Sequence, residues 1–134
     1  MSRRPLLVAA AAGAIILFGI ATYRTEGSAH GRVFPALVGD LSPHDKAVRQ
    51  GLLLAQDALN AAPDATPVAV EFHDPAGSVD TALAHLRALE ARKVDVVVDF
   101  TGAELLLGCA KHLRASPLVV LTSEPDPRFA ATRC

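Results

Sequence analysis

The chain has 134 residues, a length that is typical of a single domain. From about Thr25 onward it holds ten Lys and Arg residues against fourteen Asp and Glu residues, so this part carries a net charge of −4. The basic residues form no cluster, which disfavours nucleic-acid binding, and the absence of tryptophan leaves no evident aromatic platform for a sugar or a base.

The first 24 residues predict a segment that is separate from the domain. Arg3 and Arg4 come first, and no further charge interrupts the apolar stretch before Arg24. The stretch is close to the shortest length that crosses a bilayer as a helix, and it is longer than most signal-peptide cores. Small residues at 27–29 offer a cleavage site. Residues 1–24 are therefore either a transmembrane anchor or a long signal peptide, and we take the anchor as the working prediction.

The basic residues near this segment also predict its orientation. Two arginines precede the span, whereas Arg24 alone follows it closely, near Glu26. Because positively charged flanks stay in the cytoplasm, the N-terminus is expected there and the domain outside it, in the periplasm. The sequence thus predicts a single-pass protein of the inner (cytoplasmic) membrane, with residues 25–31 as a polar linker and residues 32–134 as the domain.

From residue 32 onward the sequence alternates between strand and helix patterns. Strands are predicted at residues 32–38, 68–73 and 94–100 and within residues 116–123, and helices at residues 44–62, 78–92 and 102–115. The apolar stripes of the first two helices are Val48, Leu52, Ala55 and Leu59, and Val79, Leu83, Leu86 and Leu89. Ser78 is a candidate N-cap of the second helix. Residues 126–134 are expected to form a short tail.

This alternation with short connections predicts an α/β fold. We expect three layers, in which a parallel sheet of about four strands has right-handed crossovers and helices on both faces. Residues 94–100 are nearly continuous in valine, which is typical of a strand buried on both faces. Ligands of such sheets bind at the carboxyl ends of the strands. The turns at these ends are residues 39–42, 74–75, 99–102 and 122–124.

The common catalytic and cofactor motifs are missing from these turns. The first turn, GDLSPHD, lacks the Gly-x-Gly-x-x-Gly of dinucleotide sites, and neither a phosphate-binding loop nor a Gly-x-Ser-x-Gly nucleophile turn is present. No two of the five histidines have helical ligand spacing, and Cys109 with His112 gives only two ligands. The sequence therefore predicts no cofactor, no metal site and no enzyme activity.

The polar end of the third strand has three interpretations. Thr101, with Glu104 three residues later, fits a capping box at the start of the next helix. The free backbone N–H groups of the same helix start, with the Thr101 hydroxyl, suit an anionic carboxylate. A receiver-like phosphoacceptor would combine Asp40, Asp99 and Thr122, but it also needs a lysine after a fifth strand and a cytoplasmic location. The third interpretation is therefore disfavoured.

The two cysteines, Cys109 and Cys134, allow two interpretations. In an oxidising compartment they could form a disulfide. Alternatively, Cys109 is a thiol of the core, because it lies four residues after Leu105 and four before Leu113 on an apolar helical stripe.

Four segments carry a resemblance to a known family. They are DLSPHDKAVRQGLLLAQDALNAA, VAVEFHDPAGSVDTALAHLRAL, ARKVDVVVDFTGAELLL and SPLVVLTSEPDPRF. In this order they resemble the N-terminal lobe of type I periplasmic solute-binding proteins, in the branched-chain amino acid and amide-binding branch of ABC transport. The likeness covers residues 32–134, about half of such a lobe, and it rests on the order and spacing of the segments.

The resemblance implies a function and a set of ligand contacts. In the family, the turns after strands 1, 3 and 4 hold the carboxylate and ammonium of an amino-acid-like ligand. The matching residues here are Ser42, Thr101, Gly102, Thr122 and Ser123. Capture of an amino-acid-like solute for ABC import is the implied role. Because an aspartate at position 99 stands where the family has glycine, a ligand ammonium would be needed to balance its charge.

The resemblance also implies an exposed sheet edge. The sequence ends after the fourth strand, before the rest of the first lobe and the whole second lobe. An open edge strand invites pairing with another chain, so we expect a protein partner there. This expectation gives an alternative function, in which the protein is a non-catalytic accessory subunit that docks on a membrane-bound periplasmic complex.

Overall fold

The computed structural model describes residues 32–124 and 126–132. The predicted anchor or signal segment at residues 1–24 and the linker at residues 25–31 lie outside the described residues. Within the described part of the chain, none of the helices has both the length and the apolar character needed to cross a membrane.

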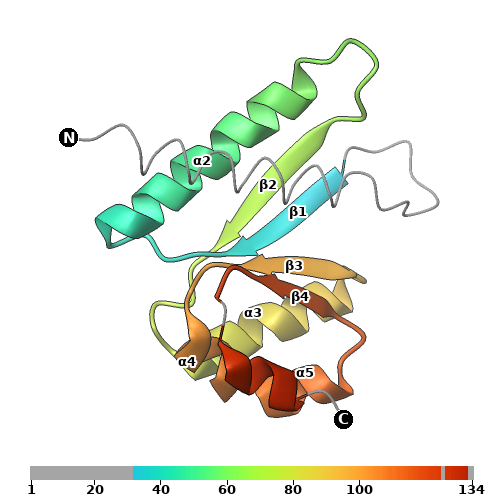
Figure 1. Ribbon diagram of the computed structural model, residues 1–134. Coiled ribbons are helices and arrows are strands. Elements are labelled where there is room, and N and C mark those ends of the chain that lie inside the picture. The colour runs from blue at the N-terminus through green and yellow to red at the C-terminus, as the bar shows by residue number, and fades with distance from the viewer. Residues whose placement is uncertain (1–31, 125, 133–134) are drawn as a thin grey trace. The chain divides into compact units, whose positions relative to one another are not determined.

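The described residues alternate between strands and helices, which confirms the predicted α/β class (Figure 1). The strands are β1 (Arg32–Leu37), β2 (Val68–His73), β3 (Val96–Asp99) and β4 (Val119–Thr122). The helices are α2 (Pro43–Asn60), α3 (Val79–Ala91), α4 (Ala103–Gly108) and α5 (Ala110–Ala115). The segment predicted as a short tail contains a 3-10 helix, η1 (Pro127–Thr132).

The four strands form one sheet in the order β2-β1-β3-β4. Strand β3 is parallel to both of its neighbours, β1 and β4. The backbone N–H groups of Arg32 and Val38 donate to the carbonyls of Pro67 and His73, at 2.7 and 3.0 Å. In both bonds the acceptor follows the donor by the same number of residues, as expected for parallel pairing of β1 with β2. The prediction of a parallel sheet of about four strands is therefore confirmed.

The described chain divides into two compact units. The first unit contains residues 32–34 and 41–71, and the second unit contains residues 35–40 and 72–132. Each unit has its own buried apolar side chains. Those of the first unit are Phe34, Val48, Leu52, Ala55 and Val68, so three of the four positions in the predicted stripe of α2 are buried.

In the first unit, side chains of α2 bind the outer backbone groups of the edge strand β2. Because the carbonyl of Pro67 faces β1, the backbone groups of Val68 and Val70 face away from β1. The Asn60 amide donates to the carbonyl of Val68 and accepts from its N–H, both at 2.8 Å. The Gln56 side-chain oxygen accepts from the N–H of Val70 at 2.7 Å. These two amides satisfy donors and acceptors that would otherwise lie open.

The core of the second unit lies between α3 and the strands. Its buried residues are Leu37, Ala82, Leu86, Leu89, Val97, Cys109 and Leu118. Val79 and Leu83 pack against this cluster as partly buried side chains, so the predicted stripe of α3 is confirmed. Figure 1 shows α3, α4 and α5 on the same side of β3 and β4. The side chain of Ser78 accepts from the N–H of Thr81 at 3.3 Å, which confirms the predicted N-cap.

The single helix predicted at residues 102–115 is divided in two at Cys109. The Cys109 N–H donates to the carbonyl of Leu106 at 3.0 Å, three residues earlier, so the last turn of α4 is tightened. Gly108 permits close approach to α3, because a Cβ there would lie 2.6 Å from Cγ2 of Val79. Sequence periodicity carried no signal of this contact, since it depends on how two helices pack.

Gly108→Ala is expected to lower the free energy of unfolding by about 1–2 kcal/mol, because the added methyl group overpacks the contact with Val79. In an ordinary helix, replacing glycine by alanine raises the free energy of unfolding by up to about 1 kcal/mol. A decrease at position 108 would therefore identify the steric contact with Val79 as its cause. Urea titration followed by far-UV circular dichroism measures it. Adding Val79→Ala should recover part of the loss, and a stabilised Gly108→Ala single variant would contradict the prediction.

Candidate functional site

The carboxyl end of β3 holds a buried carboxylate that joins two loops. The Asp99 side chain is 0 % exposed. Its Oδ1 accepts from the hydroxyl of Thr101 at 2.6 Å and from the Thr101 N–H at 3.2 Å. Its Oδ2 accepts from the hydroxyl of Thr122 at 3.1 Å. Because β3 and β4 are parallel and Asp99 pairs with Thr122, the two loops begin side by side.

Burial raises the pKa of the Asp99 carboxyl above its ordinary value. The hydrogen bonds from Thr101 and Thr122 act in the opposite direction, because they favour the ionised form. The negative charge of Glu124 adds to the increase in pKa. Asp99 is therefore easier to protonate than an exposed aspartate.

The predicted capping box of Thr101 and Glu104 is wrong. Helix α4 has Gly102 as its N-cap, at φ +103°, and no side chain bonds to the cap. The Thr101 hydroxyl and N–H both donate to Oδ1 of Asp99, which holds Thr101 outside the helix and leaves Gly102 at the N-cap position. Only glycine adopts a φ of this kind without strain, so Gly102 is needed to turn the chain into α4.

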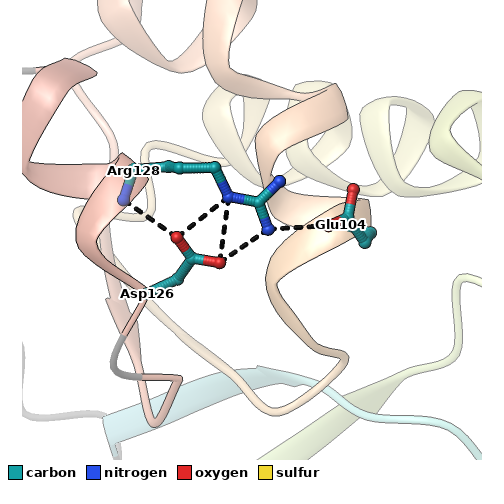
Figure 2. A network of polar contacts seen from close by, with 3 residues as sticks. All are labelled: Glu104, Asp126 and Arg128. Carbon is teal, nitrogen blue, oxygen red and sulfur yellow. Dashed lines mark hydrogen bonds and ion pairs between the residues drawn. The ribbon is translucent and has the colours of Figure 1, made fainter.

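Glu104 belongs to a surface ion-pair network instead (Figure 2). Its Oε1 lies 2.6 Å from Nη2 of Arg128, and the same nitrogen lies 2.6 Å from Oδ2 of Asp126. These partners raise the pKa of the Arg128 guanidinium, and Arg128 lowers the pKa of Asp126. The network ties η1 to α4 but is exposed, so it contributes little to stability.

The predicted ligand residues fall into two groups. Thr101 and Thr122 are brought together by Asp99, and Gly102 and Ser123 flank them in the second unit. The Ser123 N–H donates to the Asp99 carbonyl at 3.3 Å. Ser42 belongs to the first unit.

Ser42 is the N-cap of α2. Its hydroxyl accepts from the N–H of Asp45 at 3.0 Å, and its own N–H donates to the Asp45 carboxylate at 3.2 Å. This capping box, followed by Pro43 at the first helical position, accounts for the sequence Ser-Pro-His-Asp at this point. Ser42 therefore has a structural role that the sequence analysis did not assign.

The buried state of Asp99 bears on the receiver-like interpretation. A phosphoacceptor carboxylate must be open to the incoming phosphoryl group, whereas Asp99 is enclosed and engaged by the two threonines. This geometry disfavours phosphorylation at Asp99.

A second carboxylate of the second unit gathers partners that are distant in sequence. Oε1 of Glu90 accepts from the hydroxyl of Ser116 and interacts with Nε2 of His112, the latter at 2.9 Å. The Ser116 hydroxyl is the main cause that lowers the pKa of Glu90. Serine and histidine both bind one carboxylate oxygen, so this cluster does not have the serine–histidine bond of a nucleophilic triad. No spacing rule could have found it in the sequence.

The sequence also did not predict a contact between two histidines, His73 at the end of β2 and His85 on α3. Nδ1 of His73 lies 3.3 Å from Nδ1 of His85, and Nε2 of His85 lies 3.2 Å from the Asp74 carbonyl. A carbonyl only accepts, so His85 carries its hydrogen on Nε2. Within the described residues, no group of three His, Cys, Asp or Glu side chains is arranged to hold a metal ion.

Cys109 is buried in the core, 1 % exposed. Burial, followed by the charge of Asp99, raises the pKa of its thiol, which favours the unreactive protonated form. Cys134, its candidate disulfide partner, lies outside the described residues. The disulfide therefore stays a prediction.

Comparison of the chain with protein-family models, with curated proteins and with solved structures gave no match. The assignment to the solute-binding family therefore stays a prediction that rests on the order and spacing of four sequence segments.

Proposed function

We propose that the protein is a membrane-anchored, extracytoplasmic domain of solute-binding-protein type that captures an amino-acid-like solute and has no catalytic role. The observation that carries the proposal is the carboxylate bridge between Thr101 and Thr122. It holds two hydroxyls next to each other at the carboxyl ends of β3 and β4, the end at which parallel sheets bind ligands. Gly102 and Ser123 complete this candidate site, and residues 1–24 would supply the anchor.

The hydrogen-bond inventory supports a ligand that carries an ammonium group. Each threonine hydroxyl has one hydrogen to donate and two lone pairs that accept. While Asp99 is ionised, both hydroxyl hydrogens are directed to it. Thr101 then offers two lone pairs, and Thr122 offers one because the other accepts from the Glu124 N–H at 3.1 Å. Lone pairs attract N–H donors and repel carboxylate oxygens, so the ammonium of the solute is the group that would lie here.

A panel of ligands tests this proposal. Thermal unfolding of the full chain in detergent should be measured with amino acids, with primary amines that lack a carboxylate, and with carboxylic acids that lack an amine. A true ligand at about a hundred times its dissociation constant stabilises the fold by about 2.7 kcal/mol. Amine-bearing compounds are expected to raise the melting temperature, and simple carboxylic acids are not.

Two variants of Thr101 separate binding from structure. Thr101→Val removes the lone pairs and should abolish the ligand-induced shift, whereas Thr101→Ser keeps the oxygen and should preserve it. Each shift is measured relative to the ligand-free variant, so a loss of basal stability does not obscure the result. The absence of a shift with every compound would count against solute capture.

The exposure of strand β4 favours a second candidate function. Val119 and Leu121 on this edge strand are 52 % and 40 % exposed. An accessory subunit that docks on a membrane-bound periplasmic complex needs such an apolar edge for contact with its partner. Co-purification from solubilised membranes tests this alternative, and recovery of the chain without any other protein would oppose it.

A further inference from the structure

Strand β4 has an outer edge whose backbone groups pair with no other strand among the described residues. It is last in the sheet order, and the N–H groups of Val119 and Ser123 donate to carbonyls of Asp95 and Asp99, at 2.8 and 3.3 Å. Backbone groups alternate in direction along a strand, so those of Val120 point away from β3. No strand lies beyond β4 in the described part of the chain.

The same strand carries an apolar stripe on one face. Val119 and Leu121 are two residues apart, so they share a face, and both are substantially exposed. They pair in register with Val96 and Val98 of β3, whereas Val97, on the opposite face, belongs to the core with α3. Natural edge strands usually carry a charge, a proline or a bulge that blocks pairing. The sequence Val-Val-Leu-Thr has none of these.

A second copy of this chain fits this edge by symmetry. If two β4 strands pair antiparallel about a two-fold axis at Val120, Val119 of each copy lies opposite Leu121 of the other. The two apolar stripes then merge into four adjacent side chains on one face. The groups of Val120 that point away from β3 would bond to those of Val120 in the second copy.

The charges at the two ends of β4 favour the antiparallel arrangement. The strand is preceded by α5, whose last turn contains the exposed Arg114, and it is followed by the exposed Glu124, whereas His112 of the same turn is engaged with Glu90. Antiparallel pairing places the acidic end of one strand beside the basic end of the other, whereas parallel pairing would place like charges together. We propose that β4 is a homodimer interface, through which two copies form one continuous sheet by antiparallel edge pairing centred on Val120.

Cysteine cross-linking tests the proposed register. Val119 and Leu121 of the second copy would form a pair without mutual hydrogen bonds, with Cα atoms about 4.5 Å apart, within the range of a disulfide. Full-length chains bearing Val119→Cys and Leu121→Cys, with different tags and in a Cys134→Ser background, are co-expressed, solubilised in detergent and oxidised. We expect a disulfide-linked heterodimer in the mixture and much less product from either variant alone.

The control is Val33→Cys, which changes a valine of comparable exposure, 47 %, on the interior strand β1. It should not cross-link. Equal yields from this control, no heterodimer in the mixture, or cross-links to a different protein would each overturn the proposal.

A second measurement does not depend on oxidation. Leu121→Lys places a charge on the exposed stripe without touching the core, so the fold should remain intact by circular dichroism. Light scattering in detergent is expected to give a protein mass of two chains for the natural sequence and one chain for the variant. A dimer that persists in Leu121→Lys, or a natural chain that is monomeric at all concentrations, would overturn the proposal.

Discussion

Asp99→Ala is expected to lower the free energy of unfolding by about 3 kcal/mol, because it leaves partly buried donors without an acceptor. The two donors of Thr101 and the hydroxyl of Thr122 all end on this carboxylate, at 2.6 to 3.2 Å. Alanine also creates a cavity, since the aspartate side chain is fully buried. Because the chain has no tryptophan, urea titration is best followed by far-UV circular dichroism.

Asp99→Asn is the matched control for this prediction. The carboxamide has the shape of the carboxylate, its oxygen can accept from Thr101, and its amide can donate to the Thr122 oxygen. The asparagine variant is therefore expected to stay within about 1 kcal/mol of the natural chain at neutral pH. If alanine and asparagine were equally destabilising, the hydrogen bonds would not be the cause.

The pH dependence of the same pair has a defined sign. Burial raises the folded-state pKa of Asp99 above the ordinary 3.8, so the folded chain binds this proton more tightly than the unfolded chain. The stability that the natural chain gains from this proton is therefore greatest at low pH, and it is lost as the pH rises from about 3.8 through the folded-state pKa.

The test is the difference in unfolding free energy between the natural chain and Asp99→Asn, because other titrating groups cancel in that difference. As the pH rises through this window, the natural chain should lose stability relative to the asparagine variant, and above the window the difference should become constant. A difference that is the same at every pH would contradict the raised pKa.

Leu86→Ala is expected to lower the free energy of unfolding by about 3 kcal/mol. Leu86 is 0 % exposed and lies in the cluster that joins α3 to Leu37 and Val97. Removing its side chain loses buried apolar area and leaves a cavity in a closely packed interior. Urea titration measures the change.

The control for this prediction is Leu54→Ala, the same substitution in a helix at a side chain that is 53 % exposed. It is expected to change the free energy of unfolding by no more than about 0.5 kcal/mol. Similar effects from both variants would mean that the second unit lacks the tight core described above.

Much of the fold follows from local patterns in the sequence. Leu86 and Leu89 recur at helical spacing because one face of α3 must be buried, and the structure buries both. Ser78 precedes an apolar periodic segment and accepts from a backbone N–H, as its side-chain chemistry favours. In these cases the interacting residues lie within a few positions of each other, so the spacing in the sequence is enough to predict the contact.

Contacts between distant segments escaped prediction for a physical reason. From the sequence, Thr101 can either cap the next helix or bond to Asp99. The structure has the bond to Asp99, and this depends on Asp99 being buried beside Thr122, which lies 23 residues later in the chain. The division between α4 and α5 likewise depends on Gly108 meeting Val79 of another helix. Local spacing determines which residues can cap or turn, whereas tertiary packing determines which partner they finally have.

The amides on α2 give the sheet one sealed end. Asn60 and Gln56 bind outer backbone groups of Val68 and Val70 on β2, while β4 at the other end of the sheet has no such cover among the described residues. A sheet with two open ends can add copies without limit and grow into a fibre. With one end sealed, joining through β4 consumes the open edge of both copies, so growth stops at two. Two side chains on a single helix would thereby limit the proposed assembly to two copies.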